Sequence, residues 1–257
     1  MDLNHPKHMA QSVITWICLT VLIAIGVFAI FPLPDYPRPK ARQISCASNM
    51  KQIGLALLQY SQDNDEQLPP RQLREADGAN VSWRVLIYPD MKDAALFRCP
   101  SNPVADSKSG MANDSITDSD FSRSYAVNSA SDNARSFGPF SGKFPNGFPL
   151  RDAAHPESLL AVVESTAAYS DFNVLAPEIF RWPASEKSKT GNLFCGHQGR
   201  TNVLYCDGHV KIIRPAASLD ALNGRPNPWT TDGAPFSPAD RAKAAQVIEY
   251  GAKQYPS

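Results

Sequence analysis

Residues 13–31, VITWICLTVLIAIGVFAIF, form an uncharged and almost wholly apolar run that constrains the chain more than any other feature. A helix needs about 20 such residues to cross the hydrocarbon core of a bilayer. The apolar part of a secretory signal peptide is shorter, about 7–15 residues, and a buried core helix normally carries a polar stripe. We therefore expect a transmembrane helix over residues 11–32, after an N-terminal tail over residues 1–10. A cleaved signal peptide and a core helix are the alternatives.

The charges and the cysteines around this run give opposing indications of its orientation. Lys7 precedes the run, whereas more basic residues follow it: Arg38, Lys40, Arg42 and Lys51. The positive-inside rule would therefore keep the following domain in the cytoplasm. An even set of cysteines outside the run instead favours an exported domain with disulfides: Cys46, Cys99, Cys195 and Cys206.

A helix packed on a small antiparallel sheet is the expected centre of an α+β domain over residues 41–257. Four prolines between positions 32 and 39 indicate a stiff linker over residues 33–40. Apolar residues at three- and four-residue steps then predict an amphipathic helix over residues 41–62. Its inner face would hold Ile44, Ala47, Met50, Ile53, Gly54, Leu57, Leu58 and Ser61.

Strands are expected in the second half of the chain. SYAVNS and SLLAVVEST each have the composition of a short strand, and the second ends at Glu164. TNVLYCDGHVKII alternates around Asp207-Gly208, which favours a hairpin with a two-residue turn whose central residues both have positive φ. Alternation then places Val203 and Tyr205 on one face and Leu204 and Cys206 on the other.

The stretch before these strands reads as irregular, and the end of the chain as helical. Pro89 ends a short apolar segment, and Ser, Asp, Asn and Gly dominate residues 101–124, which indicates a long surface loop. Ser237 as a cap and Pro238 in a first turn predict a last helix that ends near Gly251.

The composition limits the class of partner. The chain has 257 residues, with 25 Lys and Arg against 25 Asp and Glu. Since nucleic-acid binding relies on a broad basic surface, this zero formal charge argues against a nucleic-acid partner.

Several quoted stretches together resemble one known family. His197 is followed by nine residues and then Asp207-Gly208, and ARQISCASNMKQIGLALLQYSQDNDEQLPP, LFRCPSNP and SYAVN accompany this motif. This pattern resembles the type IV pilin-like, or pseudopilin-like, proteins with a prepilin-type N-terminal segment and a C-terminal His-x9-Asp-Gly domain, similar to type II secretion protein G.

The resemblance implies a place and a role. It implies a non-enzymatic subunit or accessory factor of a type II secretion or type IV pilus-like assembly, with other pilin-like or secretion-system proteins as partners. It also implies a single pass through a bacterial cytoplasmic membrane with the C-terminal domain exported. The alternatives are a singly tethered exported binding module for a polymer or partner protein and, third, an exported hydrolase.

The N-terminal processing site of such proteins is not matched. Their Gly-Phe-Thr-Leu-Ile-Glu sequence is cut after the glycine, which would place the cut between Ala10 and Gln11, and Thr15 stands where the glutamate belongs. We therefore expect an uncleaved anchor, and mass spectrometry that finds Gln11 as an N-methylated terminus would refute this.

Three chemical sites are conceivable, and each has a simpler structural reading. Zinc would use Cys195, His197, Cys206 and His209, an unusual spacing for a tetrahedral site. Catalysis would use His197 as base, Asp207 as its orienting acid and Glu164 as a third group, but no nucleophile motif accompanies them. Calcium would use Asp114, Asp118 and Asp120, which lack the glycine and final glutamate of an EF-hand loop. We expect no metal, no cofactor and no catalytic residue.

Disulfide bonds are a more favourable prediction for the cysteines than metal ligation. Cys46 with Cys99 would tie the first helix of the domain to the sheet and contribute roughly 3–4 kcal/mol. Cys195 with Cys206 would clip the segment that carries His197 to the hairpin. Connectivity does not follow from sequence alone, so both pairings are hypotheses.

Overall fold

The computed structural model describes residues 15–23, 26, 38–74, 80–102, 121–132, 136–166, 171–172, 174–175, 193–219 and 225–254. The chain divides into two compact units, Met1–Arg38 and Pro39–Ser257. In the first unit residues 15–23 are helical, and their large apolar side chains are exposed, Trp16 at 67% and Leu22 at 66%. No helix among the described residues is both long and apolar enough to span a membrane. Because the rest of residues 11–32 lies outside the described ranges, the transmembrane helix stays a prediction.

The first helix of the second unit, α2 (Arg38–Asp63), extends the expected helix at its N-terminus. It includes Pro39, which the linker was expected to hold. Proline fits the first turn of a helix because the N–H groups there have no helical acceptor. One face of α2 is buried at steps of three and four residues: Cys46, Met50, Ile53, Leu57 and Ser61. The prediction that Ile44 lies on this face is wrong, since its side chain is 60% exposed.

A five-stranded sheet in the order β7-β3-β6-β8-β9 lies at the centre of the domain. Its strands are β3 (Tyr125–Asn128), β6 (Leu160–Glu164), β7 (Asp171–Phe172), β8 (Thr201–Tyr205) and β9 (Val210–Ile213). The sheet is antiparallel except at one edge, where β7 runs parallel to β3, which corrects the expected all-antiparallel sheet. Asp171 of β7 is held there by hydrogen bonds from Arg71 at 2.6 Å and Ser129 at 3.1 Å, so side chains as well as the ladder fix this edge.

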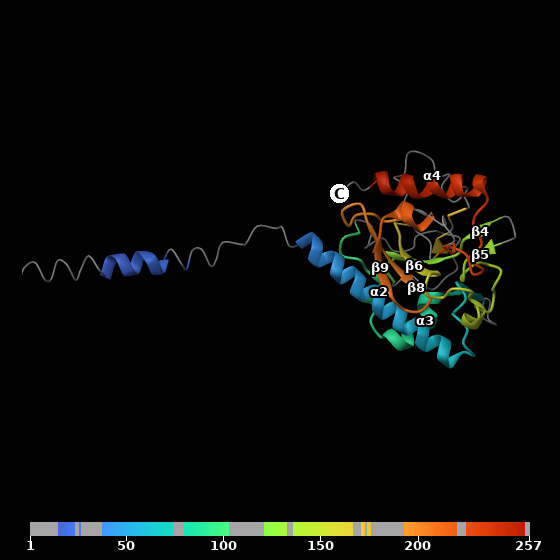
Figure 1. The fold of residues 1–257 in the computed structure, drawn as a ribbon. Helices are drawn as coiled ribbons and strands as arrows, with labels where there is room; N and C mark the ends of the chain where they lie inside the picture. The colour runs from blue at the N-terminus through green and yellow to red at the C-terminus, as the bar shows by residue number, and fades with distance from the viewer. Residues whose placement is uncertain are drawn as a thin grey trace, which may run out of the picture. The chain divides into compact units, whose positions relative to one another are not determined.

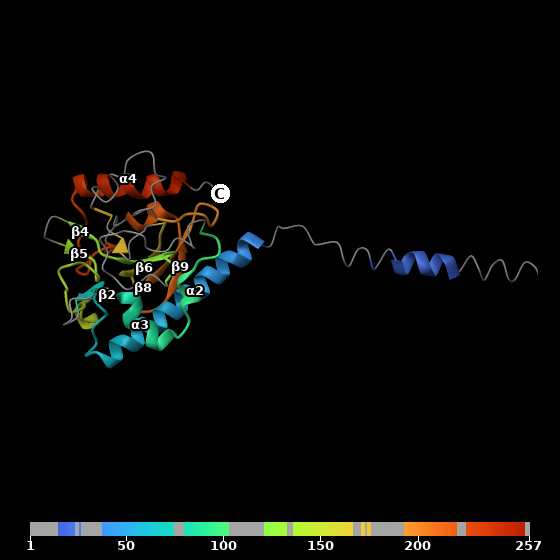
Figure 2. The ribbon, with the colours of Figure 1, turned by 180° about the vertical axis from the view of Figure 1, so that it is seen from behind.

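Helices cover both faces of the sheet, with α2 on one face and α4 (Pro238–Gln254) on the other (Figure 1). Figure 2 shows the same layers from behind. Val162 and Leu204 pack toward α2, whereas Val163 and Val203 pack toward α4. Tyr205 and Cys206 follow the same alternation, so the predicted faces of β8 are confirmed. The mixed α+β class is therefore confirmed as well.

The remaining elements are short. Two-stranded sheets join β1 (Gln72–Arg74) to β2 (Asn80–Ser82) and β4 (Ser131–Asp132) to β5 (Ser136–Phe137). The 3-10 helices are η1 (Ala94–Phe97), η2 (Leu150–Asp152) and η4 (Pro215–Leu219).

Helices α3 and α4 both begin at a serine cap. The apolar segment before Pro89 is the helix α3 (Trp83–Met91) rather than irregular chain, and Ser82 accepts a hydrogen bond from the Arg84 amide. At the start of α4, Ser237 Oγ accepts a 3.1 Å hydrogen bond from the Asp240 amide, which confirms the predicted cap. Helix α4 ends at Gln254, three residues beyond the expected Gly251.

Candidate functional site

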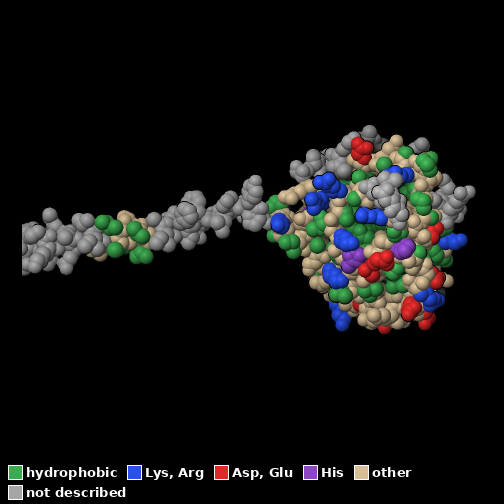
Figure 3. All heavy atoms as spheres, viewed as in Figure 1, with side chains coloured by type: hydrophobic (Ala, Val, Ile, Leu, Met, Phe, Trp, Pro, Cys, Tyr) green, Lys and Arg blue, Asp and Glu red, His purple; other side chains and the backbone are tan. Residues whose placement is uncertain are grey.

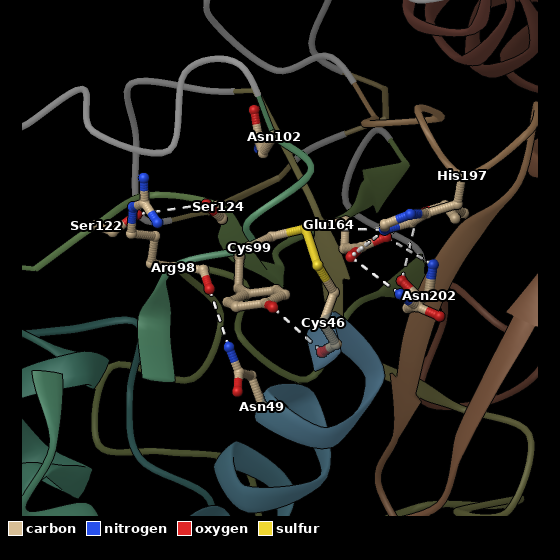
Figure 4. Close-up of a disulfide and its surroundings, with 12 residues drawn as sticks. Cys46, Asn49, Arg98, Cys99, Asn102, Ser122, Ser124, Glu164, His197 and Asn202 are labelled. Atoms are coloured by element: carbon tan, nitrogen blue, oxygen red, sulfur yellow. Dashed lines mark hydrogen bonds and ion pairs between the residues drawn. A yellow bond between two sulfur atoms is a disulfide. The ribbon is translucent and has the colours of Figure 1, made fainter. Parts of the chain in front are cut away.

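A disulfide joins Cys46 of α2 to Cys99, which follows η1, and confirms the first predicted pairing (Figure 4). Both cysteines are fully buried. Two hydrogen bonds support the same contact. Asn49 Nδ2 donates to the Arg98 carbonyl at 2.9 Å, and the Tyr125 hydroxyl donates to the Cys46 carbonyl at 3.1 Å. The N-terminal half of α2 is therefore fastened both covalently and by polar contacts.

The second predicted pairing is wrong, because Cys195 and Cys206 are free, buried thiols. They belong to the apolar clusters on opposite faces of the sheet, Cys195 with Val203 and Cys206 with Leu204. The Cys195 thiol donates a hydrogen bond to the Leu193 carbonyl at 3.3 Å. Burial, and secondarily the charge of Glu164, raises the pKa of Cys195 to about 12. Burial likewise raises the pKa of Cys206.

Glu164, the last residue of β6, lies beside the disulfide and accepts several hydrogen bonds (Figure 4). Its carboxylate receives the amide N–H of Asn202 at 2.8 Å and the side-chain Nδ2 of Asn202 at 3.0 Å. Thr201 Oγ1 lies 3.5 Å away. His197 Nε2 lies 3.0 Å from Oε1, and the side chains of His197 and Glu164 are only 1% and 0% exposed. Both carboxylate oxygens are thus satisfied in a site without solvent access.

The turn before β8 directs His197 into this site. Gly199 N–H donates to the Cys195 carbonyl at 3.1 Å, and Arg200 N–H donates to the His197 carbonyl at 3.2 Å. Gln198 and Gly199 both have positive φ, +56° and +71°, which reverses the chain directly after the histidine. Such a conformation is costly for a residue other than glycine, so the buried contacts of His197 must maintain it.

Asp207 and Gly208 lie at the tip of the β8–β9 hairpin. The loop between β8 and β9 comprises three residues, Cys206, Asp207 and Gly208, so the prediction of a two-residue turn is wrong. Within this loop only Gly208 has positive φ, +84°. A three-residue loop with glycine in the left-handed position is another common hairpin connection. Asp207 Oδ1 accepts hydrogen bonds from the His209 amide at 3.1 Å and contacts His209 Nδ1 at 2.5 Å.

The hairpin tip packs directly on α2. Lys51 Nζ donates a 2.6 Å hydrogen bond to the Gly208 carbonyl. A Cβ atom on Gly208 would lie 2.7 Å from Leu58 Cδ1, and one on Gly54 would lie 2.7 Å from Leu204 Cδ1. Glycine at positions 54 and 208 therefore permits close contact between helix and hairpin.

The spacing of the His-x9-Asp-Gly motif thus has a structural meaning. His197 precedes β8 and Asp207 follows it, so the motif extends along one strand of the central sheet. At one end His197 contacts the disulfide of α2, with Nε2 3.7 Å from Cys99 Sγ. At the other end Gly208 accepts from Lys51 of the same helix. The motif holds α2 against the sheet at two points.

The catalytic grouping expected from the sequence is only partly present. Glu164, not Asp207, is the acid beside His197, since Asp207 pairs with His209 at the hairpin tip. Sequence reasoning missed the role of Asn202, because its side chain donates to a carboxylate 38 residues away in the sequence. The apolar strand that ends in Glu164 is the only local signal of this site, since a charge at the end of a buried strand needs a partner.

The predicted zinc set does not assemble either. Among the described residues, the one group that brings three or more metal-ligating side chains together is Cys46, Cys99, Glu164 and His197, with one ligand atom of each within 4.8 Å of the others. It shares only His197 with the predicted set. In the disulfide form, both sulfur atoms of this group are bonded to each other. The calcium candidates Asp114, Asp118 and Asp120 lie outside the described residues.

A cavity of about 450 Å³ opens on the α4 side of the turn that carries His197. Its lining includes apolar residues, among them Pro215, Leu219 and Ile248, and three charged ones, Arg200, Arg214 and Glu249. The face shown in Figure 3 carries both acidic and basic side chains among apolar ones.

Part of the chain matches a family model. Residues 36–97 match the model of a family described as a protein of unknown function, DUF1559. The match covers α2 and Cys46 and ends at Phe97, two residues before Cys99. No curated protein and no solved structure matches the chain. The match therefore extends over the segment that the disulfide and the His-x9-Asp-Gly motif fasten to the sheet.

Proposed function

We propose that the protein is a non-enzymatic, membrane-anchored pilin-like subunit or accessory factor of a type II secretion or type IV pilus-like assembly. Its C-terminal domain is exported from a bacterial cytoplasmic membrane. The His-x9-Asp-Gly motif and the apolar run of residues 13–31 support this proposal. The family match begins at residue 36, shortly after this run, and includes α2.

The outward face of α2 is the observation that carries the proposal. Ile44 and Leu55 are 60% and 56% exposed although both are large and apolar. They are eleven residues apart, which at 3.6 residues per turn is about three turns, so they lie on the same side of the helix. The opposite side is held against the domain by the disulfide at Cys46 and by the buried side chains of Ile53 and Leu57. Two exposed apolar side chains on one side of a firmly held helix suit packing against a second pilin-like helix.

The buried position of His197 supports the non-enzymatic part of the proposal. A general base must come within hydrogen-bond reach of its substrate. His197 and Glu164 are 1% and 0% exposed, and Glu164 is already occupied by Asn202. This arrangement suits a structural contact better than catalysis.

The alternative function, a singly tethered exported binding module, is favoured by the cavity beside α4. Its apolar lining and its charged residues of both signs, Arg200, Arg214 and Glu249, suit a ligand with an apolar body and polar groups. In that case the protein would act as a monomer with one partner.

Site-specific crosslinking in native membranes tests the proposal. A photo-crosslinking amino acid in place of Leu55 is expected to give adducts between copies of the chain or with other pilin-like proteins. The same amino acid in place of Ile212, an exposed apolar residue of β9, is the matched control and is expected to give fewer. Equal yields at both positions, or adducts with a single unrelated protein, would contradict the proposal, and the second outcome would support the binding module.

A further inference from the structure

Four buried side chains converge at the contact between α2 and the sheet. They are Cys46 of α2, Cys99 after η1, Glu164 at the end of β6 and His197 of the turn before β8. One ligand atom of each lies within 4.8 Å of the other three. All four residues are at most 3% exposed. Figure 4 shows the disulfide, Glu164 and His197 next to one another.

The chemistry of this set is that of a tetrahedral zinc site, provided that the sulfur atoms are thiolates. Zinc prefers two to four sulfur and nitrogen ligands with a carboxylate allowed, at about 2.3 Å to sulfur and 2.0–2.2 Å to nitrogen or oxygen. Tetrahedral angles then require separations of about 3.5 Å between sulfur and nitrogen and about 3.4 Å between nitrogen and oxygen. The structure has 3.7 Å from Cys99 Sγ to His197 Nε2 and 3.0 Å from His197 Nε2 to Glu164 Oε1.

The distance between the two sulfur atoms is the one that has to change. Two thiolates on one zinc ion lie about 3.8 Å apart, whereas a disulfide holds its sulfurs about 2.05 Å apart. Opening the disulfide therefore supplies the missing ligands with a movement of less than about 2 Å. The surroundings already orient the carboxylate, because Asn202 donates to both of its oxygens, as outer residues do at metal sites.

We propose that the reduced protein binds one zinc-class divalent ion through Cys46, Cys99, His197 Nε2 and Glu164 Oε1. Disulfide and metal are then alternative means of holding α2 on the sheet. A phosphine reductant and water convert the disulfide into two thiols and a phosphine oxide. The metal ion next replaces the two thiol protons, which are released to solvent.

Cobalt binding to the full chain tests this proposal. The protein is reduced with a phosphine, freed of reductant without oxygen, and titrated with Co²⁺, whose visible spectrum reports tetrahedral thiolate coordination. We expect one tetrahedral Co²⁺ per reduced chain, its displacement by Zn²⁺, and no such spectrum for the disulfide form. A reduced wild-type chain without a tetrahedral spectrum overturns the proposal.

Variants separate this site from adventitious binding. Cys46→Ser with Cys99→Ser is expected to abolish the spectrum, and His197→Ala to weaken binding by at least about tenfold. Cys195→Ser with Cys206→Ser is the matched control, because it removes two other buried thiols and should leave the spectrum unchanged. A spectrum that persists without Cys46 and Cys99, or disappears without Cys195 and Cys206, overturns the proposal.

A measurement of tertiary structure is needed in case reduction of the disulfide alone partly unfolds the domain. Near-ultraviolet circular dichroism of the reduced chain should then return to the signal of the disulfide form when Zn²⁺ is added. Zinc that binds without restoring this signal overturns the proposal, because the site as described requires the folded domain.

Discussion

His197 Nε2 and Glu164 Oε1 lie 3.0 Å apart, with both side chains removed from solvent. Glu164 ends β6 and His197 lies in the turn before β8, and Asn202 donates two further hydrogen bonds to the same carboxylate. Because buried polar groups are stabilising only when they are paired, these three side chains depend on one another. The histidine of the His-x9-Asp-Gly motif therefore has a structural task at the contact between α2 and the sheet.

Removal of the Glu164 carboxylate should destabilise the domain strongly. Glu164→Ala leaves the donors of Asn202 and the His197 ring without an acceptor, and we expect a loss of about 3–5 kcal/mol in the free energy of unfolding. Urea denaturation measures it. Glu157→Ala is the matched control, because Glu157 also pairs with a histidine, His155 at 3.5 Å, but with its side chain 62% exposed.

The control pair should contribute little. Exposed ion pairs are screened by water, so Glu157→Ala should change stability by less than about 0.5 kcal/mol. If Glu164→Ala and Glu157→Ala lowered the free energy of unfolding by similar amounts, burial of the Glu164 pair would add nothing to stability. His197→Ala combined with Glu164→Ala should cost less than the sum of the single changes, because either change alone already breaks the pair.

Reduction of the disulfide should lower stability by a comparable amount. Cys46 and Cys99 are 53 residues apart, and closing a loop of that length contributes about 4 kcal/mol by chain entropy. The comparison is urea denaturation with and without a phosphine reductant, in the presence of a chelator. The variant Cys46→Ala with Cys99→Ala should not respond to the reductant. A response of that variant equal to the response of wild type would contradict the assignment.

Two glycines with similar backbone conformation distinguish strain from packing. Gly208 has φ +84° and a Cβ there would meet Leu58 Cδ1 at 2.7 Å, whereas Gly199 has φ +71° and nothing within 4 Å. Gly199→Ala should cost about 1–2 kcal/mol for the left-handed conformation alone. Gly208→Ala should cost more, because Leu58 of α2 must also move. Equal losses in thermal or urea denaturation would mean that the hairpin tip is not tightly packed on the helix.

Alkaline pH should weaken the fold through Cys206. Burial raises the pKa of this thiol above its ordinary value of 9.0, so the folded state keeps a proton that the unfolded state releases. The contribution to stability is complete below about pH 9 and is lost as pH rises, at about 1.4 kcal/mol per pH unit. Tyr125, whose pKa is raised mainly by burial, adds to the loss above about pH 10.

A variant isolates this contribution. Urea midpoints of wild type and Cys206→Ala, measured at several pH values from about 8 to 11, should converge as the pH rises. Parallel curves would show that the thiol does not titrate differently in the folded and unfolded states.

Local patterns were sufficient for the elements that depend on local chemistry. The alternation of Val203, Leu204, Tyr205 and Cys206 fixed the two faces of β8, because side chains on a strand alternate whatever the partner strand is. The cap at Ser237 was predicted for the same reason, since a serine side chain and a nearby amide suffice for it. Neither required knowledge of the tertiary structure.

The pairings across long separations did not follow from the sequence. Glu164 and His197 are 33 residues apart, and only the register of β6 with β8 brings them together. Cys195 and Cys206 are closer in sequence, but they pack into the apolar clusters on opposite faces of the sheet. Ile44 was assigned to the buried face of α2 by its three-residue step to Ala47, but it precedes Cys46 by two residues and so lies about 200° around the helix from it, on the exposed side.

Crosslinking of the wild-type chain in its native membrane tests the proposed assembly most directly. The account predicts a ladder at multiples of the 28.1 kDa chain, or mixed bands with other pilin-like proteins. It also predicts that Leu55→Glu, which places a charge on the outward face of α2, shortens the ladder while the domain stays folded. A wild-type chain that remains at 28.1 kDa, or pairs with a single unrelated protein, would contradict assembly through α2.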